Sequence, residues 1–321
     1  MSASVLSAKH FHDEQAAYEF VEAYLWPRGP VCPHCGGVDR ISKMGGKSTR
    51  IGAYKCYDCR KPLTVKIGTI FEASHIPMHK WLQAIFLISS SKKGINSNQL
   101  HRTLDITIKS AWFMSHRIRE AMKSIGGMFS EGGGTIEADA TYVGGKEKNR
   151  HRSKRNPKVI GGVGKQCVFT LVQRDGGARS FHIPTVDSSN LKPILLSQLN
   201  VRKTNLMTDG ERPLRALKHL VATHETVNHE AGEYVRGNVH TNTVEGFFSI
   251  LKRGIIGTYH HVSAAHLHRY TAEFDFRYTN RQGKEKIDGK WVKTGMDDTE
   301  RADAILKGVK GKRLMYKTVG C

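Results

Sequence analysis

Two closely spaced pairs of cysteines constrain the N-terminal part of this chain more strongly than any other feature. Cys32 and Cys35 form the first pair, and Cys56 and Cys59 form the second after 20 intervening residues. Each C-x-x-C pair presents two thiolates from one tight turn, so the two pairs together complete a closed tetrahedral metal site. The spacing predicts a zinc ribbon over residues 28–72 with one structural Zn²⁺. Iron in a rubredoxin-like site is the chemical alternative.

The charge of the chain predicts a polyanionic partner. Lys and Arg total 50 against 29 Asp and Glu, which gives a formal net charge of +21 over 321 residues. Such an excess favours nucleic acid as the partner, although a merely soluble basic protein has the same composition. The sequence contains neither a stretch of about 18 uninterrupted apolar residues nor a secretory signal at its start. We therefore expect a cytoplasmic, nucleoid-associated protein without a membrane partner.

Helical patterns flank the ribbon on both sides. Apolar residues at helical spacing predict a helix within residues 1–27 and another after Pro77. Two further helices, separated by a turn at residues 105–107, predict a helical, helix-turn-helix-like DNA-binding region over residues 75–130. The second of them, Ile108–Met122, is basic, and its candidate DNA contacts are Lys109, Arg117 and Arg119. A helical connector with a solvated basic face fits the same pattern.

Strand patterns begin near residue 133. Residues 135–143 alternate, with Glu137, Asp139 and Thr141 on one face. We then expect a hairpin over 167–173 and 179–186, a helix over 191–199, a strand over 204–208 that delivers Asp209, a helix over 213–221 and a strand over 223–228. A basic loop follows the first strand, and its candidate contacts with the DNA backbone are Lys146, Lys148, Arg150, Arg152, Lys154 and Arg155.

The stretch from residue 239 to 255 predicts a helix that docks on the core. Its apolar stripe is formed by Val244, Phe247, Phe248, Leu251 and Ile255. Glu245 and Lys252 fall on one flank of this stripe, where a carboxylate and an ammonium group can reach one phosphodiester. Asn242 and Glu245 also fit a capping box, in which Asn242 caps the helix and Glu245 reaches back to its N–H.

The ordered set of motifs resembles the zinc-ribbon DDE transposases of prokaryotic insertion sequences, specifically the fifteen-ninety-five family. The resemblance covers residues 15–282 and rests on the ribbon, on Asp209 and on the motifs at 68–72, 92–100, 111–119, 139–146, 239–246, 252–254, 257–261 and 269–278. Asp209 and Glu245 are separated by 35 residues, and Lys252 follows Glu245 by seven, as the resemblance implies.

The resemblance implies an α/β fold with a ribonuclease H-like mixed-sheet catalytic domain over residues 133–281. Asp139, Asp209 and Glu245 would be carboxylate ligands of two Mg²⁺ or Mn²⁺ ions, with Asn242 as the alternative third ligand. Lys252 and Arg253 would lie near the DNA backbone. Ala140 stands where many relatives carry an acidic residue. The basic tail, residues 282–321, is expected to be partly disordered apart from a helix near 299–308.

The implied activity is metal-dependent cleavage at the ends of an insertion sequence, followed by strand transfer into target DNA. The implied partners are the terminal repeats of the element, the target DNA and a second copy of the chain, since synapsis of two ends requires a dimer or a larger assembly. Two other functions fit the same residues. One is a zinc-ribbon DNA-binding regulator with an inactive ribonuclease H-like domain, and the other is a nuclease on the same fold that hydrolyses DNA without joining it.

Overall fold

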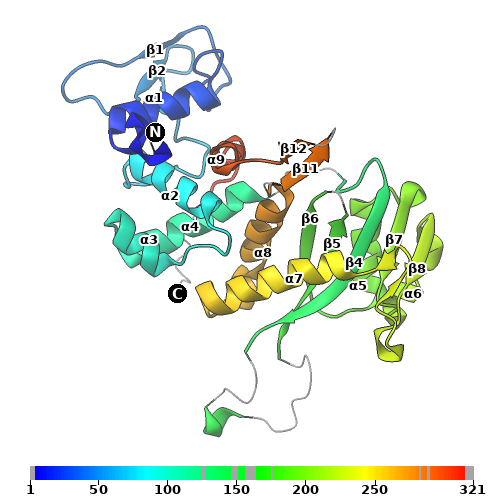
Figure 1. Cartoon of the computed structure of the whole chain (residues 1–321). Coiled ribbons are helices and arrows are strands. Elements are labelled where there is room, and N and C mark those ends of the chain that lie inside the picture. The colour runs from blue at the N-terminus through cyan, green and yellow to red at the C-terminus, as the bar shows by residue number, and fades with distance from the viewer. Residues whose placement is uncertain are drawn as a thin grey trace. The chain divides into compact units, whose positions relative to one another are not determined.

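The computed structural model describes residues 4–123, 128–145, 151–155, 164–174, 176–281, 283–287 and 290–314. The chain divides into two compact units, the first formed by Met1–Lys123 with Gln282–Cys321 and the second by Ser124–Arg281 (Figure 1). The five segments expected from the sequence are a finer division, which stays a prediction. Within the described ranges, no helix is long and apolar enough to cross a membrane.

The first unit combines a small antiparallel sheet with a group of helices. Its strands, in the order β1-β2-β3, are β1 (Ile41–Lys43), β2 (Tyr54–Cys56) and β3 (Pro62–Leu63). Its helices include α1 (Glu14–Leu25), α2 (Met78–Ser90), α3 (Ser97–Leu104) and α4 (Ile108–Met122). The helix α1 lies within the predicted residues 1–27, and Asp13 caps it, since the Asp13 carboxylate accepts a hydrogen bond from the Ala16 N–H at 2.7 Å. In the core, the buried rings of Phe71 and Trp81 meet edge to face with centroids 5.3 Å apart.

The C-terminal segment contains more regular structure than we expected. The predicted helix forms as α9 (Asp298–Lys307), which starts with a capping box between Asp297 and Glu300 and packs against α1, α2 and α4. Before it, β11 (Gly283–Ile287) and β12 (Lys290–Thr294) pair as an antiparallel hairpin. The expectation of disorder is therefore wrong for these two strands. Lys310 continues the attachment, since its Nζ donates to the Leu25 carbonyl at 2.6 Å.

The second unit is built on a five-stranded mixed sheet in the order β6-β5-β4-β7-β8. Its strands are β4 (Gly134–Val143), β5 (Gln166–Gln173), β6 (Ala178–Ile183), β7 (Thr204–Thr208) and β8 (Thr223–Thr226). The pairs β4–β5 and β5–β6 are antiparallel, whereas β4–β7 and β7–β8 are parallel. The parallel pairs require crossover connections, which α5 (Ser188–Gln198) and α6 (Arg212–Arg215) provide.

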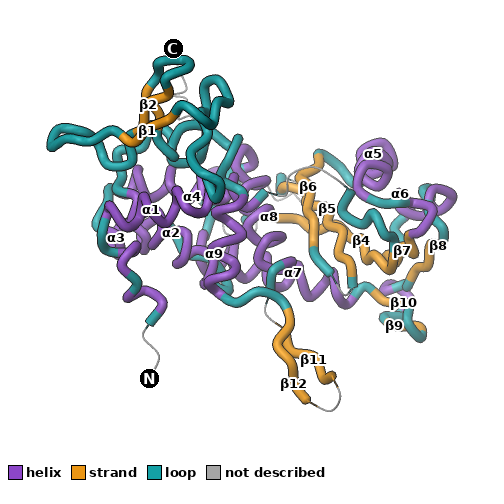
Figure 2. The backbone as a smooth tube through the Cα atoms, turned by 90° about the horizontal axis from the view of Figure 1, so that it is seen from above, coloured by secondary structure: helices purple, strands orange, loops and turns teal. Residues whose placement is uncertain are grey.

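Helices cover both faces of this sheet, as Figure 2 shows. On one face, Ile136 and Ala138 of β4 pack with Leu191 and Leu195 of α5. On the other face, Val143 of β4 packs with the apolar stripes of α7 (Asn242–Gly254) and α8 (Ala264–Thr279). The alternation predicted for β4 is confirmed, and it directs Glu137, Asp139 and Thr141 to the face that carries α7.

Two local features of the second unit differ from the sequence prediction. The helix expected over residues 213–221 is interrupted, because α6 ends at Arg215 and only a 3₁₀ turn, Lys218–Leu220, follows. A short hairpin of β9 (Val235–Arg236) and β10 (Val239–His240), absent from our prediction, leads directly into α7. After α7 the chain continues as a π-helix, Ile255–Tyr259, before α8 begins.

Candidate catalytic site and zinc site

Asp139 and Asp209 lie beside each other because of the register between two parallel strands. β4 and β7 pair Gly134 with Thr204 and, at the far end, Glu137 with Met207. Continued by two residues beyond that last pair, the same register brings Asp139 level with Asp209 on the same face. Neighbouring strands are about 4.8 Å apart, so the two residues lie close together. Asp209 follows the last residue of β7, and Gly210 then turns the chain away with a positive φ of 80°.

Glu245 approaches the same face from α7. The apolar stripe of that helix is buried against the sheet, and this leaves the Glu245 side chain 47% exposed on the flank. Its Oε1 accepts a hydrogen bond from the Thr241 hydroxyl at 2.9 Å and lies 3.7 Å from Nε2 of His229. Thr241 and His229 were not predicted from the sequence. They restrict the orientation of the Glu245 carboxylate.

The electrostatics of Asp139 indicate that acidic groups gather around it. Burial is the largest cause that raises the pKa of Asp139 to about 7, and the neighbouring charge of Asp209 is the next. The backbone N–H of Ala140, 2.6 Å from Oδ1, opposes the rise, while Glu211 and Glu245 add to it. Glu211 was also missed by sequence reasoning, although it stands only two residues after Asp209. The structure therefore brings all three predicted acidic residues, and a fourth, within electrostatic range of one another.

The donor atoms of Asp139, Asp209 and Glu245 are carboxylate oxygens, the kind of ligand that hard divalent cations prefer. Of the His, Cys, Asp and Glu side chains in the described ranges, only the four ribbon cysteines form a group whose ligand atoms all lie within 4.8 Å of one another. Asp139, Asp209 and Glu245 do not form such a group. Bound cations would also neutralise the repulsion that raises the pKa of Asp139.

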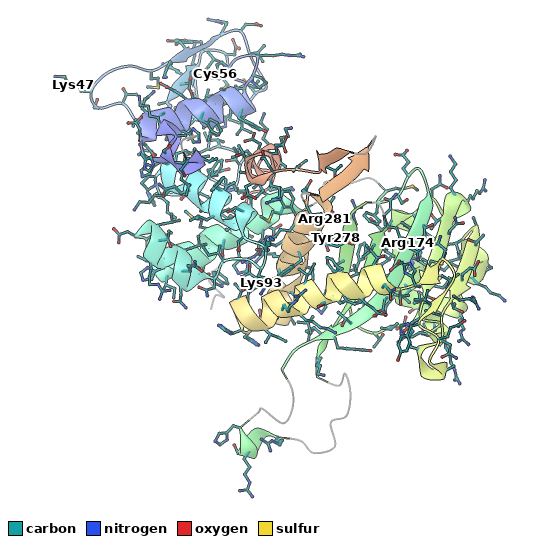
Figure 3. All side chains as sticks on the ribbon, viewed as in Figure 1. Lys47, Cys56, Lys93, Arg174, Tyr278 and Arg281 are labelled. Atoms are coloured by element: carbon teal, nitrogen blue, oxygen red, sulfur yellow. The ribbon has the colours of Figure 1, made fainter. Side chains whose placement is uncertain are left out.

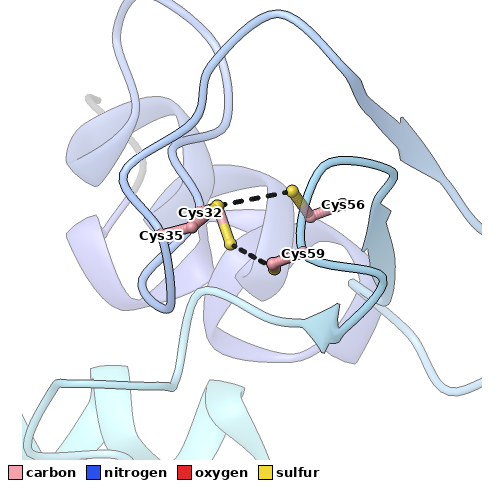
Figure 4. A group of neighbouring side chains, drawn as sticks. All are labelled: Cys32, Cys35, Cys56 and Cys59. Carbon is pink, nitrogen blue, oxygen red and sulfur yellow. Dashed lines mark hydrogen bonds between the residues drawn. The ribbon is translucent and has the colours of Figure 1, made fainter.

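The four ribbon cysteines converge as predicted (Figure 4). The Sγ atoms of Cys32 and Cys59 are 3.6 Å apart, and those of Cys35 and Cys56 are 3.7 Å apart. A tetrahedral zinc with Zn–S bonds of about 2.3 Å separates its sulfur ligands by about 3.8 Å. The thiolates therefore already stand at the spacing that zinc requires, and they support Zn²⁺ as the resident metal.

Two family models match the chain. A transposase zinc-ribbon domain matches residues 12–62, and an ISXO2-like transposase domain matches residues 132–279. The chain belongs to these zinc-ribbon transposases. An uncharacterized protein in the transposable element ISH50 of Halobacterium salinarum is 28% identical over 295 residues, which are 88% of this chain and 97% of that relative. The resemblance stated from the sequence motifs is thereby confirmed.

The N-terminus of α7 in this transposase is capped differently from the sequence prediction. Asn242 is the first residue of the helix rather than its cap, and the Glu245 carboxylate accepts from the hydroxyl of Thr241. The cap comes instead from Glu137 of β4, whose Oε2 accepts the N–H groups of Thr243 and Val244 at 2.7 and 3.0 Å. A carboxylate at a helix N-terminus stabilises the helix by up to about 2 kcal/mol in partly buried settings. The capping box, the alternative interpretation of Asn242 and Glu245, is therefore wrong.

The basic residues predicted to contact DNA fall into different environments in the transposase. Arg117 and Arg119 are buried at 6% and 1% exposure, and the Nη1 of Arg117 donates to the carbonyls of Ile70 and Glu72 at 2.8 and 2.7 Å. Their predicted contact with DNA is therefore wrong, because both guanidinium groups serve the packing of the first unit. The remaining predicted residues with a described side chain are exposed, namely Lys109, Arg152, Arg155, Lys252 and Arg253. The side chain of Lys154 and the whole of Lys146, Lys148 and Arg150 lie outside the described residues.

Proposed function

We propose that this transposase cleaves DNA at the ends of its element and joins the freed ends to target DNA, with Asp139, Asp209 and Glu245 as the carboxylates that hold two divalent cations. The observation that carries the proposal is the raised pKa of Asp139, which reflects burial and the charges of Asp209 and Glu245 at one edge of the sheet. Buried like charges of this kind cost stability, and they are typical of functional sites.

The topology of the sheet supports a ribonuclease H-like domain. Three antiparallel strands, β6-β5-β4, are extended by two parallel strands, β7 and β8. The register places Asp209, which immediately follows β7, level with Asp139 in the middle of β4, and the β9–β10 hairpin leads directly into the N-terminus of α7. A strand, a strand end and a helix thus each contribute one carboxylate.

The cations are Mg²⁺ or Mn²⁺, because carboxylate oxygens are the ligands that these hard ions prefer. When bound, they supply Lewis-acid stabilisation of the attacking and leaving oxygens of a phosphodiester. Water attacks the phosphodiester at the element end and frees a 3′-hydroxyl, which then attacks a target phosphodiester in line. The chain itself contributes positioning. Asp139 is held within β4 and Asp209 directly after β7, and Lys252 and Arg253, exposed further along α7, hold the DNA backbone.

Recognition of DNA by the first unit involves α3 rather than α4. Most of α4 is buried, including the two arginines expected to contact DNA. The preceding helix exposes Asn98, Gln99 and Arg102, whose amide and guanidinium groups are the side chains that read base edges. Lys109, exposed at the start of α4, supplies a phosphate contact beside them. Because two element ends must be held together, the active assembly is at least a dimer on nucleoid DNA.

A strand-transfer assay tests the proposal. The full chain with zinc bound is incubated with a labelled duplex of the element end and a target plasmid, in buffers containing Mg²⁺, Mn²⁺ or neither. We expect both nicked duplex and a duplex–plasmid joined product, each only with a divalent cation. Binding without cleavage would indicate a DNA-binding regulator, and cleavage without joining would indicate a nuclease. Either result overturns the proposal.

A further inference from the structure

A buried carboxylate, Glu137, connects the strand that carries Asp139 to the helix that carries Glu245. Glu137 lies two residues before Asp139 on the same face of β4 and is fully buried. Its Oε2 accepts the N–H groups of Thr243 and Val244 at 2.7 and 3.0 Å. Its Oε1 accepts from the Thr243 hydroxyl at 2.8 Å and from Nε of Arg174 at 2.7 Å. One side chain of β4 therefore receives four hydrogen bonds, three of them from the first turn of α7.

Arg174 extends this connection to the chain that leads into α7. It follows the last residue of β5, and Figure 3 shows it at the end of α7 that approaches the sheet. Its Nη1 donates to the carbonyl and to the side-chain oxygen of Asn238, both at 2.7 Å. Its Nη2 donates to the carbonyl of His240 at 3.1 Å. The guanidinium group thus holds the turn and the second strand of the β9–β10 hairpin, while the Glu137 carboxylate holds the helix itself.

The apolar contacts of α7 with the sheet and its hydrogen bonds to Glu137 restrict the position of the helix in different ways. The apolar stripe on the sheet is non-directional, so it fixes the face of the helix but resists small axial displacements weakly. The hydrogen bonds to Glu137 are directional, and they fix the first turn along the helix axis. Val244, which Glu137 holds directly, immediately precedes Glu245. Small axial displacements of the helix would therefore change the separation of Glu245 from Asp139.

We propose that Glu137 and Arg174 are positioning residues, which form a clasp that sets the position of Glu245 relative to Asp139 for cation binding. The proposal rests on the proposed role of these two carboxylates. The clasp itself contributes no ligand, because both oxygens of Glu137 are occupied by donors from Thr243, Val244 and Arg174.

The test compares Glu137→Gln and Arg174→Gln with a matched variant, Glu273→Gln. Glu273 is also fully buried in the second unit and also pairs with an arginine, Arg277, but it lies on α8 and accepts from the Tyr259 hydroxyl at 2.6 Å. Binding of Mn²⁺ to each zinc-loaded full chain is measured from the loss of the electron paramagnetic resonance signal of the free ion. The Mn²⁺ binding that disappears in Asp139→Asn is assigned to the candidate site. Melting temperature, binding of element-end DNA and cleavage are measured in parallel.

We expect both clasp variants to weaken Mn²⁺ binding at the Asp139-dependent site by about 10–100-fold, the usual effect of removing groups that orient metal ligands. Their binding of DNA should match the parent. Glu273→Gln should lower the melting temperature without changing the affinity for Mn²⁺. If Glu137→Gln fails to fold, Arg174→Gln and the milder Thr243→Val are compared with Glu273→Gln instead. Thr243→Val removes the hydroxyl that donates to Glu137.

Three results would overturn the clasp. They are parent-like Mn²⁺ affinity in the folded clasp variants, an equal loss of affinity in Glu273→Gln, and loss of DNA binding in parallel with loss of Mn²⁺ binding. A parent chain without any Asp139-dependent Mn²⁺ binding would instead overturn the proposed function, and the clasp with it. The two failures are therefore distinguishable.

Discussion

Asp139 and Asp209 stand level with each other because each lies two residues beyond a paired residue of the parallel strands β4 and β7, Glu137 and Met207 respectively. Asp139 lies within β4, whereas Asp209 immediately follows the last residue of β7, so the register of the two strands brings them to the same level. Glu245 is different, since it lies on a helix whose first turn is held by Glu137. The candidate site consists of two aspartates placed by strand register and a third carboxylate whose position depends on how one helix is attached.

The first prediction concerns pH and the chain without Mg²⁺ or Mn²⁺. Burial and neighbouring carboxylates raise the pKa of Asp139 to about 7, whereas the ordinary value, expected in the unfolded chain, is 3.8. The folded state thus binds a proton that the unfolded state releases, so this contribution to stability is complete below about pH 4 and is lost as pH rises through about 7. We expect Asp139→Asn to melt at the parent temperature near pH 4 and above it at pH 8. A difference that stays constant between pH 4 and pH 8 would contradict the assignment.

The second prediction separates Glu245 from Asn242 as the third ligand. The Glu245 carboxylate is oriented by the Thr241 hydroxyl, so its replacement should remove a positioned ligand. We expect Glu245→Gln to lose more activity in single-turnover cleavage than the roughly 10–100-fold caused by removing an orienting group. Asn242→Ala should stay within that range or below it. The reverse order of the two variants would assign the ligand to Asn242.

The third prediction concerns zinc. Four thiolates at the spacing of a tetrahedral site bind zinc with an apparent free energy of about 10–16 kcal/mol in small domains, and this energy is folding energy. We expect Cys35→Ser to lose the zinc measured by atomic absorption and to lose hydrogen-exchange protection in β1, β2 and β3. Cys167→Ser is the control, because Cys167 is buried in the core of the second unit and should not affect the zinc content. Zinc retained at parent level by Cys35→Ser would contradict the site.

The fourth prediction tests α3 as the helix that recognises DNA. Loss of a side chain that reads a base costs about 1–3 kcal/mol of discrimination between DNA sequences. A cost of about 1.4 kcal/mol corresponds to a tenfold loss of affinity. We expect Arg102→Ala to weaken binding of the element end more than binding of random duplex, as measured by fluorescence anisotropy at fixed salt. Lys192→Ala, an exposed lysine on α5 of the second unit, should leave the ratio of the two affinities unchanged. An equal loss on both duplexes would reduce Arg102 to a phosphate contact.

Much of this architecture is determined by local patterns. The cysteine spacing predicts the ribbon, and alternation predicts β4 with the face that carries Asp139. The strand β7 forms over the predicted residues, Thr204–Thr208, and Asp209-Gly210 ends it.

The remaining features depend on partners that lie far away in the sequence. Glu137 was visible only as an acidic residue on the correct face, and its role requires Arg174 and Thr243 to arrive from other elements. Arg117 looked like a DNA contact because α4 is basic, but the carbonyls of Ile70 and Glu72 satisfy its guanidinium group inside the first unit. Long-range hydrogen bonds of this kind leave no periodic pattern in the sequence.

Cleavage of the element-end duplex by Asp139→Cys, with Mg²⁺ and with Mn²⁺, tests the central claim most directly. A thiolate is a poor ligand for Mg²⁺ and a better one for the transition metal Mn²⁺. The cleavage rate of the variant is divided by the rate of the parent in the same buffer. If Asp139 holds a catalytic cation, the variant should be inactive with Mg²⁺ and recover cleavage with Mn²⁺. The same normalised rate in both cations would contradict direct contact between Asp139 and a catalytic metal ion.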